Sequence, residues 1–178
     1  MDIKDIFLYF AQFPSEDGVI ASFTNGSSNY PEYTKLLEQY NSGSKDRLPN
    51  IEGFVFGQNF DAVKARIDTM TGNFLFVEVG DIESTQDQKG NINDTMKIAC
   101  TIAYKENRDA DLVEHMIVSD QSLSLINQLR ANLFKDQCPW LRMINGTTQI
   151  QPFVSSELAS VGWSLMFNLK GQIFDIKG

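Results

Sequence analysis

The sequence predicts an α+β fold, a single domain with a mostly antiparallel or mixed sheet of about four to five strands. One long helix and one or two shorter helices are expected to pack on this sheet. Two segments, 95–105 and 161–170, alternate between apolar and other residues, as strands with one buried face do. A helical pattern runs through 111–134 between them. Because 178 residues suffice for one core, we expect residues 1–178 to form one domain.

The chain is predicted to open with a short amphipathic helix. Apolar residues recur at helical spacing from Ile3 to Phe10, and Asp2 precedes them in the position of an N-cap. Pro14 is expected to end this helix.

Residues 14–53 are rich in Ser, Gly, Asn and Pro and are expected to form a partly irregular, insertion-like excursion. One helical island is predicted at 31–40, where Pro31 suits the first turn. Three tyrosines in the excursion, at Tyr30, Tyr33 and Tyr40, are expected to be exposed. Long connections are often functional or loosely ordered. The tyrosines are therefore candidates for a contact surface, with a loosely packed loop as the alternative.

The next elements predicted are a strand at 54–56, a helix over 59–70 ended by Gly72, and a strand at 74–79. The buried side of this helix is expected to hold Phe60, Val63, Ile67 and Met70. The strand at 74–79 is apolar on both faces, as in a strand covered on both sides, except at Glu78. No motif ties a second acid to Glu78, so we expect a structural or rim position for it.

Residues 80–94 are polar and are expected to form a projecting arm between two antiparallel strands, longer than a tight hairpin. Lys89-Gly90-Asn91 supplies the turn signal. Since the segment lacks an apolar anchor, we expect it to act between molecules. Its candidate contact residues are Asp81, Glu83, Asp87, Lys89 and Asn91.

The strand at 95–105 and the helix after it carry the clearest patterns. On the strand, the predicted core face holds Met96, Ile98, Cys100, Ile102 and Tyr104. Either Asp109 or Asp111 can cap the helix, which continues to about Phe134. Its buried stripe is predicted to be Leu112, Met116, Leu123, Ile126, Leu129 and Leu133.

Two strands are predicted after the helix. Asn145-Gly146 is expected to form a turn into a strand at 147–154, which Pro152 assigns to an edge of the sheet. In the last strand, Trp163 belongs to the apolar face and is predicted to lie in the core.

Composition and motifs exclude several classes of function. A net charge of −8 argues against a phosphate-binding surface, so no direct or sequence-specific nucleic-acid binding is expected. No apolar run reaches membrane length, and we expect a cytoplasmic protein. The two cysteines, Cys100 and Cys138, form neither a disulfide framework nor a metal motif. No cofactor is predicted, and neither Glu78 nor the single histidine, His115, has a matched catalytic partner. We expect no enzymatic activity.

The order of elements resembles that of the tail terminator, or tail-completion, proteins of long-tailed bacteriophages and prophages. The resemblance covers roughly Phe54 to Leu169. It rests on a helix leading into an apolar strand (FDAVKARIDTMTGNFLFVEV), a polar arm, a long strand (MKIACTIAYK), a long helix (DLVEHMIVSDQSLSLINQLRANL) and a strand beginning at a Gly-Trp pair (VGWSLMFNLK). The chain departs from that pattern by its longer 14–53 segment and its C-terminal tail.

The resemblance implies a structural subunit that forms a ring with copies of itself, usually a hexamer. Such a ring ends the polymerisation of the tail tube and binds the head connector, so the tail tube and the head-connector proteins are the implied partners. The implied locations are the host cytoplasm and the virion tail. The alternative is a non-catalytic adaptor of a mobile element or bacterial host, which binds one protein partner as a monomer.

Overall fold

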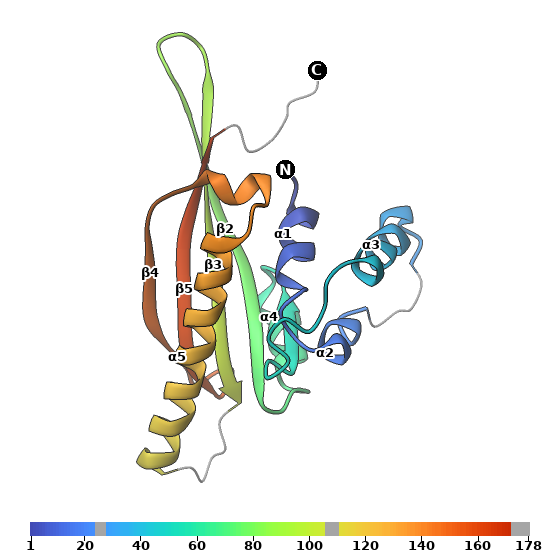
Figure 1. The fold of residues 1–178 in the computed structure, drawn as a ribbon, viewed down its shortest axis with the longest axis vertical. Coiled ribbons are helices and arrows are strands. Elements are labelled where there is room, and N and C mark those ends of the chain that lie inside the picture. Colours follow the sequence, from blue (N-terminus) through green and yellow to red (C-terminus); the bar gives the residue numbers. More distant parts are fainter. Residues whose placement is uncertain (24–27, 106–110, 172–178) are drawn as a thin grey trace.

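A five-stranded mixed sheet forms the centre of the protein (Figure 1). The computed structural model describes residues 1–23, 28–105 and 111–171. The strands lie in the order β1-β2-β3-β5-β4, with β1 parallel to β2 and the other neighbours antiparallel. They are β1 (Gly53–Phe56), β2 (Asn73–Gln86), β3 (Ile92–Lys105), β4 (Ile144–Ser155) and β5 (Ser160–Gly171). The predicted α+β class and largely antiparallel sheet are confirmed.

The described residues contain more short helices than the sequence predicts. The helices are α1 (Ile3–Phe10), α2 (Glu16–Ile20), α3 (Pro31–Ser42), α4 (Phe60–Ile67), α5 (Leu112–Lys135) and a 3-10 helix, η1 (Pro139–Met143). The unpredicted α2 is a single turn capped by the Ser15 hydroxyl, which accepts from the Gly18 amide. A turn this short leaves no apolar periodicity to recognise. No described helix is long and apolar enough to cross a bilayer.

The sheet is covered on both faces, but unequally. On one face, α1, α5 and η1 bury a large cluster against the middle strands, including Phe10, Ile126 and Trp140. On the other face, α4 buries a smaller cluster around Phe74 and Ala103. β3 therefore has its predicted core face, and part of its second face is buried as well. The tight pairing of β3 and β5 depends on Gly162, where a Cβ would lie 2.1 Å from the carbonyl oxygen of Ile102.

The long helix begins at Asp111, whose carboxylate accepts from the amides of Val113 and Glu114. The alternative cap, Asp109, lies outside the described residues. The second half of the predicted stripe is confirmed: Ile126, Leu129 and Leu133 are buried, and Leu123 is half-buried.

The first half of that predicted stripe is wrong. Leu112 and Met116 are 87% and 64% exposed. Figure 1 shows the first turns of α5 extending past the end of the sheet that is opposite the arm. Because no described element covers these turns, an apolar side chain with helical periodicity stays in solvent there. Periodicity identifies a face of a helix, but burial also needs a neighbouring element.

The described part of residues 14–53 has more regular structure than the predicted insertion-like excursion. Its helix α3 is two residues longer than predicted. The segment buries four side chains in the main core, those of Val19, Tyr40, Leu48 and Ile51. Two backbone hydrogen bonds join the end of the segment to the residues that follow α1. The Arg47 amide donates to the Gln12 carbonyl at 3.0 Å, and the Leu48 amide donates to the Phe13 carbonyl at 2.8 Å.

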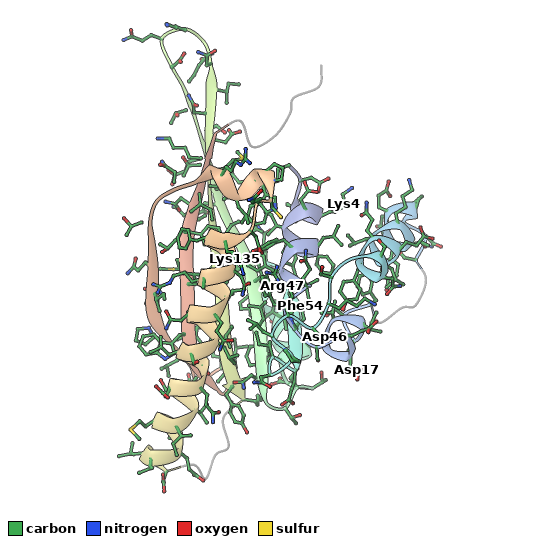
Figure 2. The ribbon with its side chains drawn as sticks, in the orientation of Figure 1. Lys4, Asp17, Asp46, Arg47, Phe54 and Lys135 are labelled. Atoms are coloured by element: carbon green, nitrogen blue, oxygen red, sulfur yellow. The ribbon has the colours of Figure 1, made fainter. Side chains whose placement is uncertain are left out.

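Arg47 joins this segment to the end of α5 (Figure 2). Its guanidinium donates to both carboxylate oxygens of Asp136, at 2.7 and 3.1 Å, and to Oδ1 of Asn132 at 2.7 Å. The Tyr9 hydroxyl donates to the same carboxylate at 2.7 Å, and the guanidinium lies over the ring of Phe13. We name the group Arg47, Asp136, Asn132 and Tyr9 the arginine clamp.

The clamp shifts the pKa values of its members. The hydrogen bond from Arg47 lowers the pKa of the Asp136 carboxyl, and that carboxylate in turn raises the pKa of Arg47. Burial raises the pKa of Tyr9, and the hydrogen bond to Asp136 raises it further.

The predicted turn at Asn145-Gly146 lies inside β4. The strand begins at Ile144, and its register against β5 shifts between Asn145 and Gln149. Gly146 adopts a φ of +82°, which suits this irregularity. Asn145-Gly146 thus has the positive φ that a turn would use, but it forms a bulge within the strand. The predicted edge position of the Pro152 strand is confirmed.

The buried half of α5 can be tested with matched aspartate substitutions. Ile126 is fully buried, and Ile126→Asp should lower the free energy of unfolding by at least about 3 kcal/mol because it buries an unpaired charge. Phe134 is 63% exposed on the same helix, so Phe134→Asp should cost less than about 1 kcal/mol. Urea unfolding followed by circular dichroism measures both. Equal stability of the two variants would contradict the assigned face.

The arginine clamp predicts an acid dependence of stability. The pKa of Asp136 in the folded protein lies below the unfolded value of about 3.9. At a pH above the unfolded pKa, the clamp therefore makes its full contribution to the free energy of unfolding. That contribution is lost as the pH falls through the lower pKa of the folded protein. Asp136→Asn should cost about 1–2 kcal/mol at neutral pH, a modest cost because the pair is partly solvated. It should also lose less stability than the parent on acidification, measured by urea unfolding from about pH 6 to about pH 2. Parallel curves for parent and variant would exclude the clamp as a source of acid sensitivity.

Candidate functional site

The arm is a regular two-stranded ribbon. β2 and β3 continue past Gly171, the last described residue of β5, which faces Asp94, and they remain paired out to Gln86 and Ile92. The expected polar connection is therefore a long hairpin with a short turn, and Figure 1 shows it projecting beyond the rest of the sheet. In the arm the backbones of β2 and β3 stay paired although their side chains are no longer buried. The polar sequence alone does not predict this pairing.

The tip of the arm is built around Asp87. Its carboxylate accepts from the amides of Lys89 and Asn91 at 2.8 and 2.9 Å, and from Nδ2 of Asn91 at 2.8 Å. These hydrogen bonds, that of the Asn91 side chain first, lower the pKa of Asp87. Gly90 takes a φ of +85°, as the turn signal predicts. Asp87 and Asn91 thus shape the tip, while no described residue forms an ion pair with the exposed ammonium of Lys89.

A bulge at the base of the arm determines which side chains share a face. The register of β2 against β3 shifts between Val79 and Ile82, so one extra residue stands on β2. After the shift, Ile82 pairs with Met96, and it therefore continues the core face of β3. Ile82 and Ile92 lie on this face and are 43% and 38% exposed.

The opposite face of the arm is polar. Lys97 donates to Glu83 at 3.0 Å and lies 3.9 Å from Asp81, and these neighbours raise the pKa of Lys97. Asp81, Glu83, Asp87, Lys89 and Asn91 are all exposed. The structure brings these five candidate residues together on one arm. Its other face carries Ile82 and Ile92, so the expectation that the segment lacks apolar residues for contacts is wrong.

The three candidate tyrosines do not form one exposed surface. Tyr30 is 75% exposed, and Tyr33 is half-buried with its ring against Phe23. The prediction for Tyr40 is wrong: it is 2% exposed and belongs to the main core. Burial raises the pKa of Tyr40 to about 12, with a smaller contribution from the charge of Glu16. The tyrosines therefore divide into one surface residue, one intermediate residue and one core residue.

A second exposed apolar surface lies at the beginning of α5. Leu112, Val113, Met116 and Ile117 are exposed by 87, 59, 64 and 48%. Four neighbouring large apolar side chains in solvent are unusual and commonly mark an interaction site. The sequence held a signal for this surface, because Val113 and Ile117 are apolar although they lie off the predicted stripe. We call these four residues the α5 patch.

The edge strand β4 is a third exposed feature. None of its twelve residues is charged, and Val154 is 78% exposed. Charged residues, prolines and bulges are the usual protection of an edge strand. β4 has only Pro152 and the bulge, so its edge is open to pairing.

Chemical groups do not converge in the described part of the chain. Glu78 is exposed on the side of the sheet opposite α5, in a cavity of about 410 Å³ beside Lys97 and Met166, whereas His115 stands in the first turns of α5. They cannot serve one site. Burial raises the pKa of both cysteine thiols, Cys100 and Cys138, which disfavours the reactive thiolate. No group of three His, Cys, Asp or Glu among the described residues could hold a metal ion.

A further cavity of about 480 Å³ lies between α1 and η1. It is lined largely by apolar and aromatic side chains, among them Leu8, Tyr9, Trp140 and Met143. Its carboxylate, Asp5, already accepts the Asp2 amide in the capping box of α1. The cavity therefore lacks the set of free polar groups that fixes a small ligand.

Comparison with known proteins adds no relative. No family model matches the chain, and neither the curated proteins nor the solved structures contain a match. The surfaces of the molecule are therefore the evidence for its function.

The different positions of the tyrosines predict different mutational costs. Tyr40→Ala should cost about 3 kcal/mol because it leaves a cavity in the core, while Tyr30→Ala should change stability by less than about 0.5 kcal/mol. The Tyr40 hydroxyl is buried without a hydrogen-bond partner in the described structure. Tyr40→Phe should therefore be neutral or stabilising. Thermal unfolding compares the three variants, and a clear loss in Tyr40→Phe would reveal a partner for the hydroxyl.

Proposed function

We propose that the protein is a structural subunit of a phage or prophage tail, a terminator that assembles with copies of itself into a ring. In this role the ring caps the finished tail tube and offers the surface to which head-connector proteins bind. The proposal combines the element order described above with the surfaces found in the structure. The subunit acts through contacts and has no catalytic role.

One observation carries the proposal: exposed surfaces suited to contacts lie at opposite ends of the same sheet. The arm extends from one end, and the α5 patch extends past the other (Figure 1). A contact that joins the two ends of successive subunits is heterologous, and such contacts form rings where the rotation closes. A ring subunit needs a pair of surfaces of this kind.

The ordered structure of the arm supports a role in contacts between molecules rather than that of a loop in solvent. A two-stranded ribbon alone is marginally stable in water, yet this one is fixed by its Asp87 turn, by the Glu83–Lys97 pair and by a 2.6 Å hydrogen bond from the Ser84 hydroxyl to Asp94. A stiff arm loses little conformational entropy on binding. It is suited to reach a neighbouring subunit or the tail tube.

Charge agrees with this role. A net charge of −8 disfavours adhesion of the subunit to a phosphate backbone. A ring that surrounds a DNA passage benefits from that property, since the DNA must move through it.

The second candidate function is a monomeric adaptor for one protein partner, and the uncharged edge strand favours it. β4 is an edge strand of twelve uncharged residues, along which one strand of a partner could pair. The two functions differ in oligomeric state. Self-association at micromolar concentration supports the ring subunit, and a monomer at every concentration supports the adaptor.

Shortening the arm tests the proposal. Replacing Gln86–Ile92 by Asn-Gly lets Thr85 and Asn93 close a two-residue turn and keeps the Ser84–Asp94 hydrogen bond. The removed residues bury little within the subunit, so Tm should change by less than about 3 °C. Native mass spectrometry should show at least about a tenfold loss of assembly, since interface changes of this size are common. Gln88→Ala, which keeps the arm, is the matched control.

In a phage whose own terminator gene is disrupted, the parent chain should restore tails of uniform length, and the shortened chain should not. If the shortened variant folds and its assembly and tail length are unchanged, the arm has no part in the proposed role. A parent chain that is monomeric and leaves tail length uncontrolled would contradict the ring subunit itself.

A further inference from the structure

We propose that the arm of one copy binds along the first turns of α5 of the next copy, with Ile82 and Ile92 on the α5 patch and Lys89 paired with Asp120. The inference rests on the proposed ring and deepens it, because it assigns both sides of the contact between subunits. The partner of each surface is a second copy of this chain.

Both surfaces carry exposed apolar side chains where they are proposed to meet. Ile82 and Ile92 lie on one face of the ribbon, with the hydrogen-bonded Ser84–Asp94 pair between them, and the Glu83–Lys97 ion pair occupies the other face. The α5 patch is more exposed than the isoleucines, and no described element covers it. Burying both removes exposed apolar area from water, the usual source of binding free energy at the centre of an interface.

The order of apolar and charged groups is also complementary. From the base of the arm to its tip, Ile82 comes first, then Ile92, and then Lys89, which has no ion-pair partner among the described residues. Along α5, Leu112 and Met116 are followed four residues later by Asp120, on the same side of the helix. Asp120 is exposed and has no ion-pair partner among the described residues. An arm that enters from the helix N-terminus thus places a cation near an anion at the inner end of the patch.

Within one subunit this contact cannot form, because the arm and the start of α5 lie at opposite ends of the sheet (Figure 1). A two-fold contact between two α5 patches would leave the isoleucines of both arms in solvent. The head-to-tail arrangement covers both surfaces and pairs opposite charges. Such a heterologous contact forms a ring where the rotation between successive copies closes.

A charge-reversal cycle tests the contact. Lys89→Glu and Asp120→Lys should each weaken self-association about tenfold, and the double variant should return to within about threefold of the parent. Native mass spectrometry and sedimentation velocity over a concentration series measure the association. Met116→Ser should also weaken it by about tenfold, while Phe134→Ser on the far half of α5 is the matched control and should leave it unchanged.

Each outcome decides the inference. Weakened single variants with a restored double variant support the contact. An oligomeric parent with unaffected variants overturns the contact and leaves the ring in place. Single variants that weaken association without restoration in the double variant overturn the Lys89–Asp120 pairing. A parent that is monomeric throughout overturns the ring proposal, and this contact falls with it.

Discussion

Burial along β3 is the constraint on which the rest of the structure depends. In its second half the strand is covered on both faces, by α5 and α1 on one side and by the smaller α4 cluster on the other. Toward its beginning, beyond the pair Asp94–Gly171, β2 is the only described strand that pairs with it. One strand thus supplies both the centre of the core and half of the arm. The pair Asp94–Gly171 thus separates the part of β3 that stabilises the subunit from the part that projects with the arm.

The arginine clamp completes the covered side of the sheet. Residues 14–53 contain short helices that are too small to be stable alone. Their attachment depends on Leu48 and Ile51 in the core and on Arg47, which binds the carboxylate at the end of α5 with two hydrogen bonds. Because Tyr9 of α1 donates to the same carboxylate, one anion connects three segments that are far apart in the sequence. The segment is therefore integral to the subunit.

The surfaces left over by this packing explain the proposed function. A helix of 24 residues is longer than the part of the sheet it covers, so its first turns carry the α5 patch into solvent. Two strands longer than their neighbour carry the arm past the other end. Neither projection is needed for the core, and both present apolar side chains. In the proposed ring, the arm of one copy contacts the α5 patch of the next copy.

The sequence by itself determined the elements that follow from local physics. Period-two alternation located β3 and β5, and the 3.6-residue period located α5. Asp2 marked the start of α1, and Pro152 indicated the edge strand. The choice of Asp111 over Asp109 as the cap of α5 came from the structure. Tertiary structure decided which apolar residues find a neighbour. Tyr40 is buried and Leu112 exposed, against prediction, because burial depends on where the covering elements end. The bulge that turns Ile82 to the same face as Ile92 and the clamp between Arg47 and Asp136 join residues distant in sequence or register, and local pattern carries no information about such pairs.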